Sequence, residues 1–162
     1  MTLELRHATP DDLSGVLGVF LGCWRESYRG ILADRAIAEM TDERAEALWR
    51  RVLASSEGAV LVATRDGSIV GLTRYAVVEG EGAVHSLYVD PRAHGGGIGK
   101  ALLEAASDAL RAAGTSAAAL WVFAANAPSI AFYEARGWRP DGTTRTQAEF
   151  GELEQRMRRE WT

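Results

Sequence analysis

The chain has 162 residues, a length typical of one domain, and its 47% hydrophobic and 25% charged residues are ordinary for a globular protein, so we expect a single domain over residues 1–162. The formal net charge of −4 argues against broad nucleic-acid binding, which usually needs a basic surface. No apolar run approaches the roughly 20 residues of a membrane span, and the first residues lack a signal-peptide core. The single cysteine, Cys23, favours a reducing compartment. We therefore expect a cytoplasmic protein without membrane or nucleic-acid partners.

The first third of the chain predicts one strand followed by helices. Residues 2–8 alternate in the strand period, and Thr9-Pro10-Asp11-Asp12 has the hydroxyl, proline and acids of a helix start. Apolar residues at helical spacing extend this helix toward Tyr28-Arg29-Gly30. A shorter helix over 33–40 and another beginning at Thr41 complete this part.

The remaining sequence predicts strands that alternate with two helices. Residues 59–65 and 68–78 flank Asp66-Gly67, a pair typical of a tight hairpin turn. A second turn at 80–82 leads to a strand over 84–89. Further elements are a helix ending at Gly114, a nearly all-apolar central strand at 117–123, a short helix from Asn126 to Gly137, and one or two final strands. This order predicts an α/β domain built on one mixed sheet.

A glycine-rich loop joins the strand at 84–89 to the following helix, in the sequence HSLYVDPRAHGGGIGKALL. The first N–H groups of a helix lack intrahelical partners, and glycine lets the backbone approach phosphate oxygens closely. The loop therefore predicts a site for a phosphate-bearing ligand. The loop does not match the P-loop pattern G-x-x-x-x-G-K-[ST], because His94 and Ala101 break it. It does not match the dinucleotide-binding pattern G-x-G-x-x-G either, because Lys100 or Leu102 stands at the position of the last glycine.

Two blocks of sequence resemble the GCN5-related N-acetyltransferase (GNAT) family. LYVDP at 87–91 with HGGGIGKALL at 94–103 matches the family's core signature, and LWV at 120–122, Asn126 and AFYEARGW at 131–138 match its later part. The resemblance implies a mixed, mostly antiparallel sheet of six to seven strands flanked by about four helices. It also implies that the splayed central strands bind acetyl-CoA, the acetyl donor.

The resemblance assigns cofactor-binding residues by position. Amides of the loop would cradle the pyrophosphate, and main-chain groups on the preceding strand would pair with the pantetheine arm. Asn126 would cap its helix and touch the same arm. His94 stands where the family usually has Arg or Gln, so this chain has a weaker cation there. The expected cofactor-binding residues are Leu87, Tyr88, Val89, His94, Gly95, Gly96, Gly97, Ile98, Gly99, Lys100, Asn126 and Tyr133.

Acetyl transfer to an amine requires that the amine lose a proton and that the departing thiolate be stabilised. By resemblance Tyr133 is the proton donor to the sulfur, and its spacing of seven residues from Asn126 places both on one side of a helix. His85 is the first candidate for the base because imidazole titrates near neutral pH. Glu79, Glu81 and water stay open as alternatives, and a purely structural His85 is equally compatible with the sequence.

The expected acceptor is a primary amine, most simply of a small molecule. Trp24 and Tyr28 lie four residues apart on one helix face and could shelter it, although Trp24 also fits a core position. Other acceptors are peptide or protein N-termini and lysines, and a non-catalytic acyl-CoA-binding module is a further alternative. Family members often form homodimers. No cluster of His, Cys and acidic residues has the spacing of a metal site.

Overall fold

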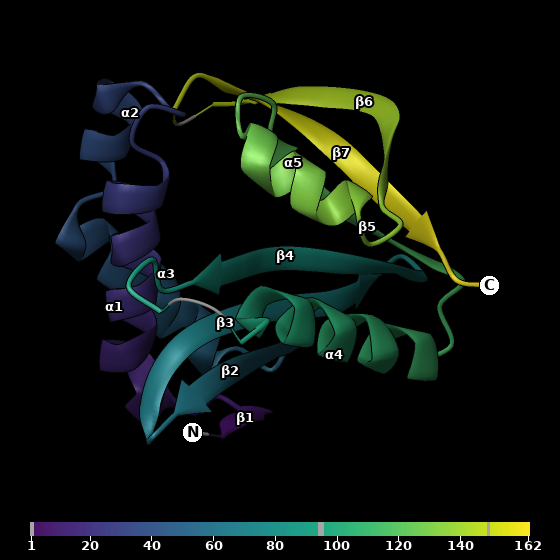
Figure 1. Cartoon of the computed structure of the whole chain (residues 1–162), viewed down its shortest axis with the longest axis horizontal. Coiled ribbons are helices and arrows are strands. Elements are labelled where there is room, and N and C mark those ends of the chain that lie inside the picture. Colours follow the sequence, from purple (N-terminus) through teal and green to yellow (C-terminus); the bar gives the residue numbers. More distant parts are fainter. Residues whose placement is uncertain (1, 94–95, 149) are drawn as a thin grey trace.

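A computed structural model describes residues 2–93, 96–148 and 150–162 (Figure 1). Its strands form one seven-stranded sheet in the order β1-β2-β3-β4-β5-β7-β6, and all neighbours are antiparallel except β4 and β5. The strands are β1 (Leu3–His7), β2 (Ala59–Arg65), β3 (Ser68–Val78), β4 (Glu81–Val89), β5 (Ala117–Phe123), β6 (Arg139–Gln147) and β7 (Glu152–Glu160). The predicted sheet class and strand number are confirmed.

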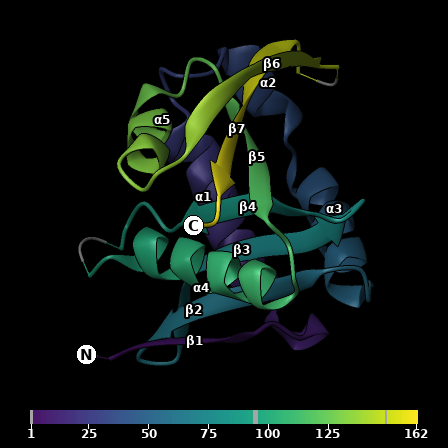
Figure 2. The same cartoon turned by 90° about the vertical axis from the view of Figure 1, so that its right-hand side faces the viewer.

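Helices cover both faces of the sheet (Figures 1 and 2). They are α1 (Leu13–Gly22), α2 (Asp34–Glu39), α3 (Asp42–Ala54), α4 (Ile98–Ala112) and α5 (Ala127–Glu134). Successive side chains of a strand point to opposite faces. Leu72 of β3 therefore joins the core beneath α1 and α3, whereas a Cβ on Gly71 would meet Ile98 and Leu102 of α4 at 2.9 Å each. Leu103 of α4 and Tyr133 of α5 share a core on that second face.

Two local features differ from the sequence prediction. The second turn lies at Glu79 and Gly80, both with positive φ (52° and 81°), so β4 begins at Glu81 inside the predicted turn. Residues Cys23–Ser27 continue α1 as a π-helical turn, closed by the Tyr28 N–H donating to the Cys23 carbonyl at 3.0 Å. Such turns are frequent at functional sites because they redirect side chains within a helix.

Candidate active site

A cavity of about 490 Å³ opens where β4 and β5 separate. Their parallel pairing covers only Gly82–Val84 against Ala118–Leu120, beyond which β4 remains paired with β3, and β5 with β7. Small residues bring the strands close at the paired end, since a Cβ on Gly82 would meet the Ala118 Cβ at 3.0 Å. The expected separation of the central strands is confirmed, and it leaves one edge of β4 without a strand partner among the described residues.

His85 is the extra residue of a β-bulge in β4. Val84 pairs with Tyr75 and Ser86 pairs with Arg74, so His85 has no partner in β3. Bulges redirect a side chain and are common beside active sites. His85 lines the cavity, where part of its surface is accessible to solvent and part is covered by protein. Partial burial lowers the pKa of its imidazole, helped by the positive charges of Arg74 and Arg145, so neutral imidazole predominates at neutral pH.

The free edge of β4 continues through the predicted pantetheine-binding residues. Leu87, Tyr88 and Val89 pair with β3 on one side only. Leu87 and Tyr88 line the cavity, whereas Val89 packs in the core near α4. The Cys23 thiol donates to the Val89 carbonyl at 3.0 Å, which ties the π-helical turn to the end of β4, and burial raises the pKa of this thiol to about 11. Cys23 is buried, and its thiol has a structural role in this contact.

The glycine loop ends at Gly97, which occupies the N-cap of α4 in the left-handed conformation (φ 64°, ψ 35°). No described atom lies within 4 Å of the Cβ that a side chain would add there. Ile98 is buried in the core, so only its main chain can face a ligand, and the side chain of Lys100 is exposed. His94 and Gly95 lie outside the described residues.

Two further described glycines of this segment, one before Gly97 and one in the first turn of α4, make close contacts. A Cβ on Gly96 would overlap the guanidinium of Arg65, which comes from the end of β2. A Cβ on Gly99 would lie 3.3 Å from the Phe132 ring of α5. Arg65 thus places a cation against the loop, a contact between distant segments that the sequence did not indicate.

Helix α5 contributes Asn126 and Tyr133 to the cavity wall. The Asn126 side chain caps the helix, as predicted, by accepting from the Ser129 N–H at 3.3 Å. Tyr133 is 9% exposed and packs edge-on against Phe132, with ring centroids 5.4 Å apart. Its hydroxyl has no hydrogen-bond partner among the described residues, and burial raises its pKa well above the usual value. The phenol therefore stays protonated at any working pH.

Aromatic rings close the cavity beside the π-helical turn. The Trp24 and Tyr28 rings contact each other edge-on at 5.1 Å, as their spacing predicted, and both line the cavity. Trp24 is also 4% exposed and belongs to the core, as the alternative interpretation of this residue predicted. Burial raises the pKa of Tyr28 well above its usual value and that of the neighbouring Tyr88 to about 12. Both phenols therefore stay neutral at neutral pH.

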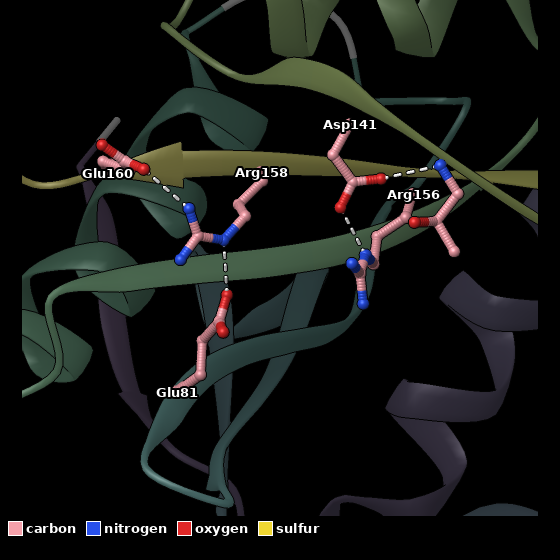
Figure 3. Close-up of polar contacts among 6 residues, drawn as sticks. Glu81, Asp141, Arg156, Arg158 and Glu160 are labelled. Atoms are coloured by element: carbon pink, nitrogen blue, oxygen red, sulfur yellow. Dashed lines mark hydrogen bonds and ion pairs between the residues drawn. The ribbon is translucent and has the colours of Figure 1, made fainter.

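Strands β6 and β7 add charged residues that the sequence analysis did not identify. Arg145, Glu154 and Arg156 line the cavity, and the Arg145 Nε donates to the buried Glu154 carboxylate at 2.8 Å. Figure 3 shows Arg156 of β7 bound to Asp141 of β6, at 2.6 Å. The charged residues of β7 could have indicated this wall of the cavity only if the pairing of β7 with β5 and β6 were known.

Arg158 crosses β5 to reach the start of β4. Its Nε donates to Glu81 at 2.8 Å and its Nη1 donates to Glu160 at 2.8 Å (Figure 3). The ion pair thereby occupies Glu81, one of the two acidic candidates for the base. Glu79, the other, is exposed in the turn before β4. Of the three side chains considered as a base, only His85 lies within the bulge.

Comparison with known proteins identifies the family. Residues 23–138 match the model of the acetyltransferase (GNAT) family. The chain belongs to the GNAT family. It is therefore an acetyl-CoA-dependent N-acetyltransferase, as the glycine loop and the later block predicted.

Individual GNAT relatives cover nearly the whole chain. An uncharacterized N-acetyltransferase from Archaeoglobus fulgidus is 32% identical over 85% of this chain and 93% of its own length. A spermidine N(1)-acetyltransferase from Thermoplasma acidophilum is 24% identical over 88% of this chain and 92% of its own. The PaiA N-acetyltransferase of T. acidophilum, solved in complex with coenzyme A, superposes with a TM-score of 0.81 at 21% identity, over 99% of this chain and all of the other. This likeness confirms the GNAT fold.

The geometry of the chain fits an acetyl-CoA ligand. The free edge of β4 offers main-chain groups to an extended arm, and the space at Gly97 lies beside N–H groups that begin α4 without a side-chain cap. No helix among the described residues is long and apolar enough to cross a membrane.

Proposed function

We propose that this GNAT enzyme acetylates the primary amine of a small molecule, with Tyr133 as proton donor to the departing thiol and His85 as acceptor of the amine's proton. The observation that carries the proposal is the unpartnered Tyr133 hydroxyl, which belongs to the wall of the same cavity as His85 and the free edge of β4. Similarity to a spermidine N(1)-acetyltransferase supports a small amine.

In this proposal, main-chain groups provide most of the contacts to acetyl-CoA. Amides at the start of α4 would hold the pyrophosphate, and Leu87, Tyr88 and Val89 would hold the pantetheine arm as an added strand, with Asn126 beside it. Acetyl-CoA supplies a thioester carbonyl that an amine can attack. The protein's own contribution is to align this edge with the acceptor cavity.

Two protons have to move for the reaction to proceed. Arg74 and Arg145 make the surroundings of His85 positive, and a positive field favours the neutral amine over ammonium. At the other end, burial keeps Tyr133 protonated. The same dry surroundings disfavour a thiolate and raise its pKa, which makes a hydrogen bond or proton from Tyr133 more effective.

A turnover screen tests this proposal. Small primary amines and short peptides are incubated with acetyl-CoA, released thiol is measured, and products are identified by mass spectrometry. We expect N-acetylated small amines to be formed faster than acetylated peptides. Faster acetylation of peptides would contradict the small-molecule acceptor, and CoA binding without any transfer would support the alternative of a non-catalytic module.

Removal of the His85 imidazole is expected to change the pH dependence of turnover. Because the pKa of His85 is below 6.5, kcat at saturating amine should fall only as the pH drops through that lower value. His85→Gln should lose this acidic limb, lower kcat about tenfold or more at pH 7, and recover as rising pH supplies free amine. His7→Gln, at an exposed histidine of β1, is the matched control. An unaltered acidic limb in His85→Gln would leave water as the base.

Loss of the Arg65 guanidinium is expected to weaken CoA binding modestly. An exposed ion pair contributes about 0.2–1 kcal/mol, so Arg65→Gln should lower the affinity by about fivefold or less at low salt, and by less at high salt. Calorimetry at two ionic strengths measures both effects, with Arg51→Gln on α3 as the control. Equal affinity in the two variants at low salt would show that Arg65 does not reach the phosphates.

A further inference from the structure

Two guanidinium groups share one aromatic ring on the β6–β7 wall of the cavity. The Arg145 Cζ lies 4.1 Å from the centroid of a Trp121 ring and the Arg156 Cζ lies 6.0 Å from one. Trp121 comes from β5, where it pairs with Arg156 across the strands. All three residues line the cavity. Cations thus gather on the β6–β7 wall, across the cavity from the strand that carries His85.

Each of these guanidinium groups is held by its Nε atom. Arg145 donates from Nε to Glu154 at 2.8 Å, and Arg156 donates from Nε to Asp141 at 2.6 Å. Their terminal Nη atoms donate to no acceptor among the described residues. The side chains are 49% and 39% exposed, so solvent or a ligand can reach them. A guanidinium fixed in this way presents its two Nη atoms as a preorganised fork, the geometry that binds a carboxylate through two hydrogen bonds.

The acidic residues at the cavity are already matched with arginines. Glu154 is bound by Arg145, and Glu81 by Arg158 (Figure 3). Only Glu79 stands apart, in the exposed turn. A second cation on the acceptor would find its carboxylates inside the cavity already bound to arginines, with only the exposed Glu79 left, whereas an anion would find N–H donors free. The lowered pKa of His85, caused partly by Arg74 and Arg145, agrees with a positive field across the cavity.

We infer that the acceptor is an amino carboxylate, whose anionic group binds the Nη atoms of Arg145 and Arg156 while its amine faces His85. This inference rests on the proposed function and narrows it to one substrate class. It distinguishes this chain from an enzyme for a polycation such as spermidine, the substrate in the name of one relative. Trp121 would act as the floor that holds both guanidinium groups in place.

Matched amine series test the inference at saturating acetyl-CoA. One series compares L-phenylalanine with L-phenylalaninamide, and another compares 5-aminopentanoate with 5-aminopentanamide and 1,5-diaminopentane. Hydrogen bonds to charged groups are about twice as strong as neutral ones, so kcat/KM should be about tenfold or more higher for the carboxylate than for its amide in at least one series. The diamine should be the poorest substrate of its series.

Arginine variants locate the effect. Arg156→Gln retains a hydrogen-bond donor toward Asp141 but removes the charge, so the carboxylate-to-amide ratio of kcat/KM should fall about tenfold, mainly through KM. The double variant Arg145→Gln/Glu154→Gln avoids an unpaired buried carboxylate and should lower the ratio as well. Arg50→Gln, on the exposed face of α3, is the control and should retain the ratio.

The possible outcomes separate the inference from the proposed function. Faster acetylation of amides or of the diamine would overturn the carboxylate inference while leaving acetyl transfer to a small amine intact. An unchanged ratio in Arg156→Gln and in the double variant would also overturn it. Binding of CoA without thiol release for any amine would overturn the proposed function, and the inference with it.

Discussion

Valine in place of Gly97 is expected to lower the affinity for CoA by about 10²-fold or more. The residue caps α4 at φ 64° and ψ 35°, and no described atom fills the space that its side chain would take. A branched side chain there would obstruct an anion and strain the loop. Losing two charge-assisted hydrogen bonds of about 1.5–3 kcal/mol each removes about 3 kcal/mol or more, which is at least 10² in affinity. Isothermal calorimetry with CoA measures the loss.

Gly114 provides a matched control at the opposite end of the same helix. It also has positive φ (93°) and no described atom within 4 Å of its Cβ position. Valine at either glycine should destabilise the fold by about 1–2 kcal/mol through the left-handed backbone. Only Gly97→Val should weaken CoA binding, and equal affinities in the two variants would reject the assigned phosphate site.

Gly99 is a less specific test of that site than its place in the signature suggests. Its neighbour is the Phe132 ring, 3.3 Å from the Cβ that a substitution would add. Valine at Gly99 would disturb the packing of α4 against α5 as well as the approach of an anion. From the sequence alone, the glycines of this segment could not be distinguished. In the structure Gly97 lies beside open space, whereas Gly96 lies against Arg65 and Gly99 against Phe132.

Local patterns were sufficient to predict most strands and helices, and the family resemblance predicted the sheet class and the acetyl-CoA cofactor. Alternation of apolar residues located the strands, and the glycines with Asn126 located the starts of α4 and α5, because these signals depend on neighbours in sequence. Long-range register was not accessible in the same way. The bulge at His85 depends on how β4 pairs with β3, and Arg158 reaches Glu81 because β5 carries the small Ala119 opposite it.

The acceptor side illustrates the same limit. Three different strands carry the residues of this wall, Trp121 on β5, Arg145 on β6 and Arg156 on β7. The strand order β5-β7-β6 brings them together along the cavity. A charged residue on a strand is ordinarily solvated, so nothing in the sequence distinguished these arginines from the other basic residues of the tail. The proposed amino-carboxylate acceptor therefore depends on the structure, whereas the family was predicted from the sequence.

Removing the Tyr133 hydroxyl is expected to slow acetyl transfer by about 10²-fold, within the usual range for a positioned proton donor. Phenylalanine retains the ring contacts with Phe132 and Trp138, at 5.4 and 6.4 Å between centroids, so the fold and CoA affinity should be nearly unchanged. Single-turnover rates are the appropriate measurement, because slow product release would mask the loss in kcat.

Tyr75→Phe provides the matched hydroxyl deletion. Tyr75 is a partly buried tyrosine of β3 that packs in the core and does not line the cavity. The single-turnover rate of the Tyr75→Phe variant should equal that of the unmodified chain. Because burial holds the pKa of Tyr133 well above 10, the Tyr133-dependent part of the rate should persist throughout the neutral and mildly alkaline range. If Tyr133→Phe matched Tyr75→Phe in single-turnover rate, Tyr133 would only fill space, and water would supply the proton to the thiolate.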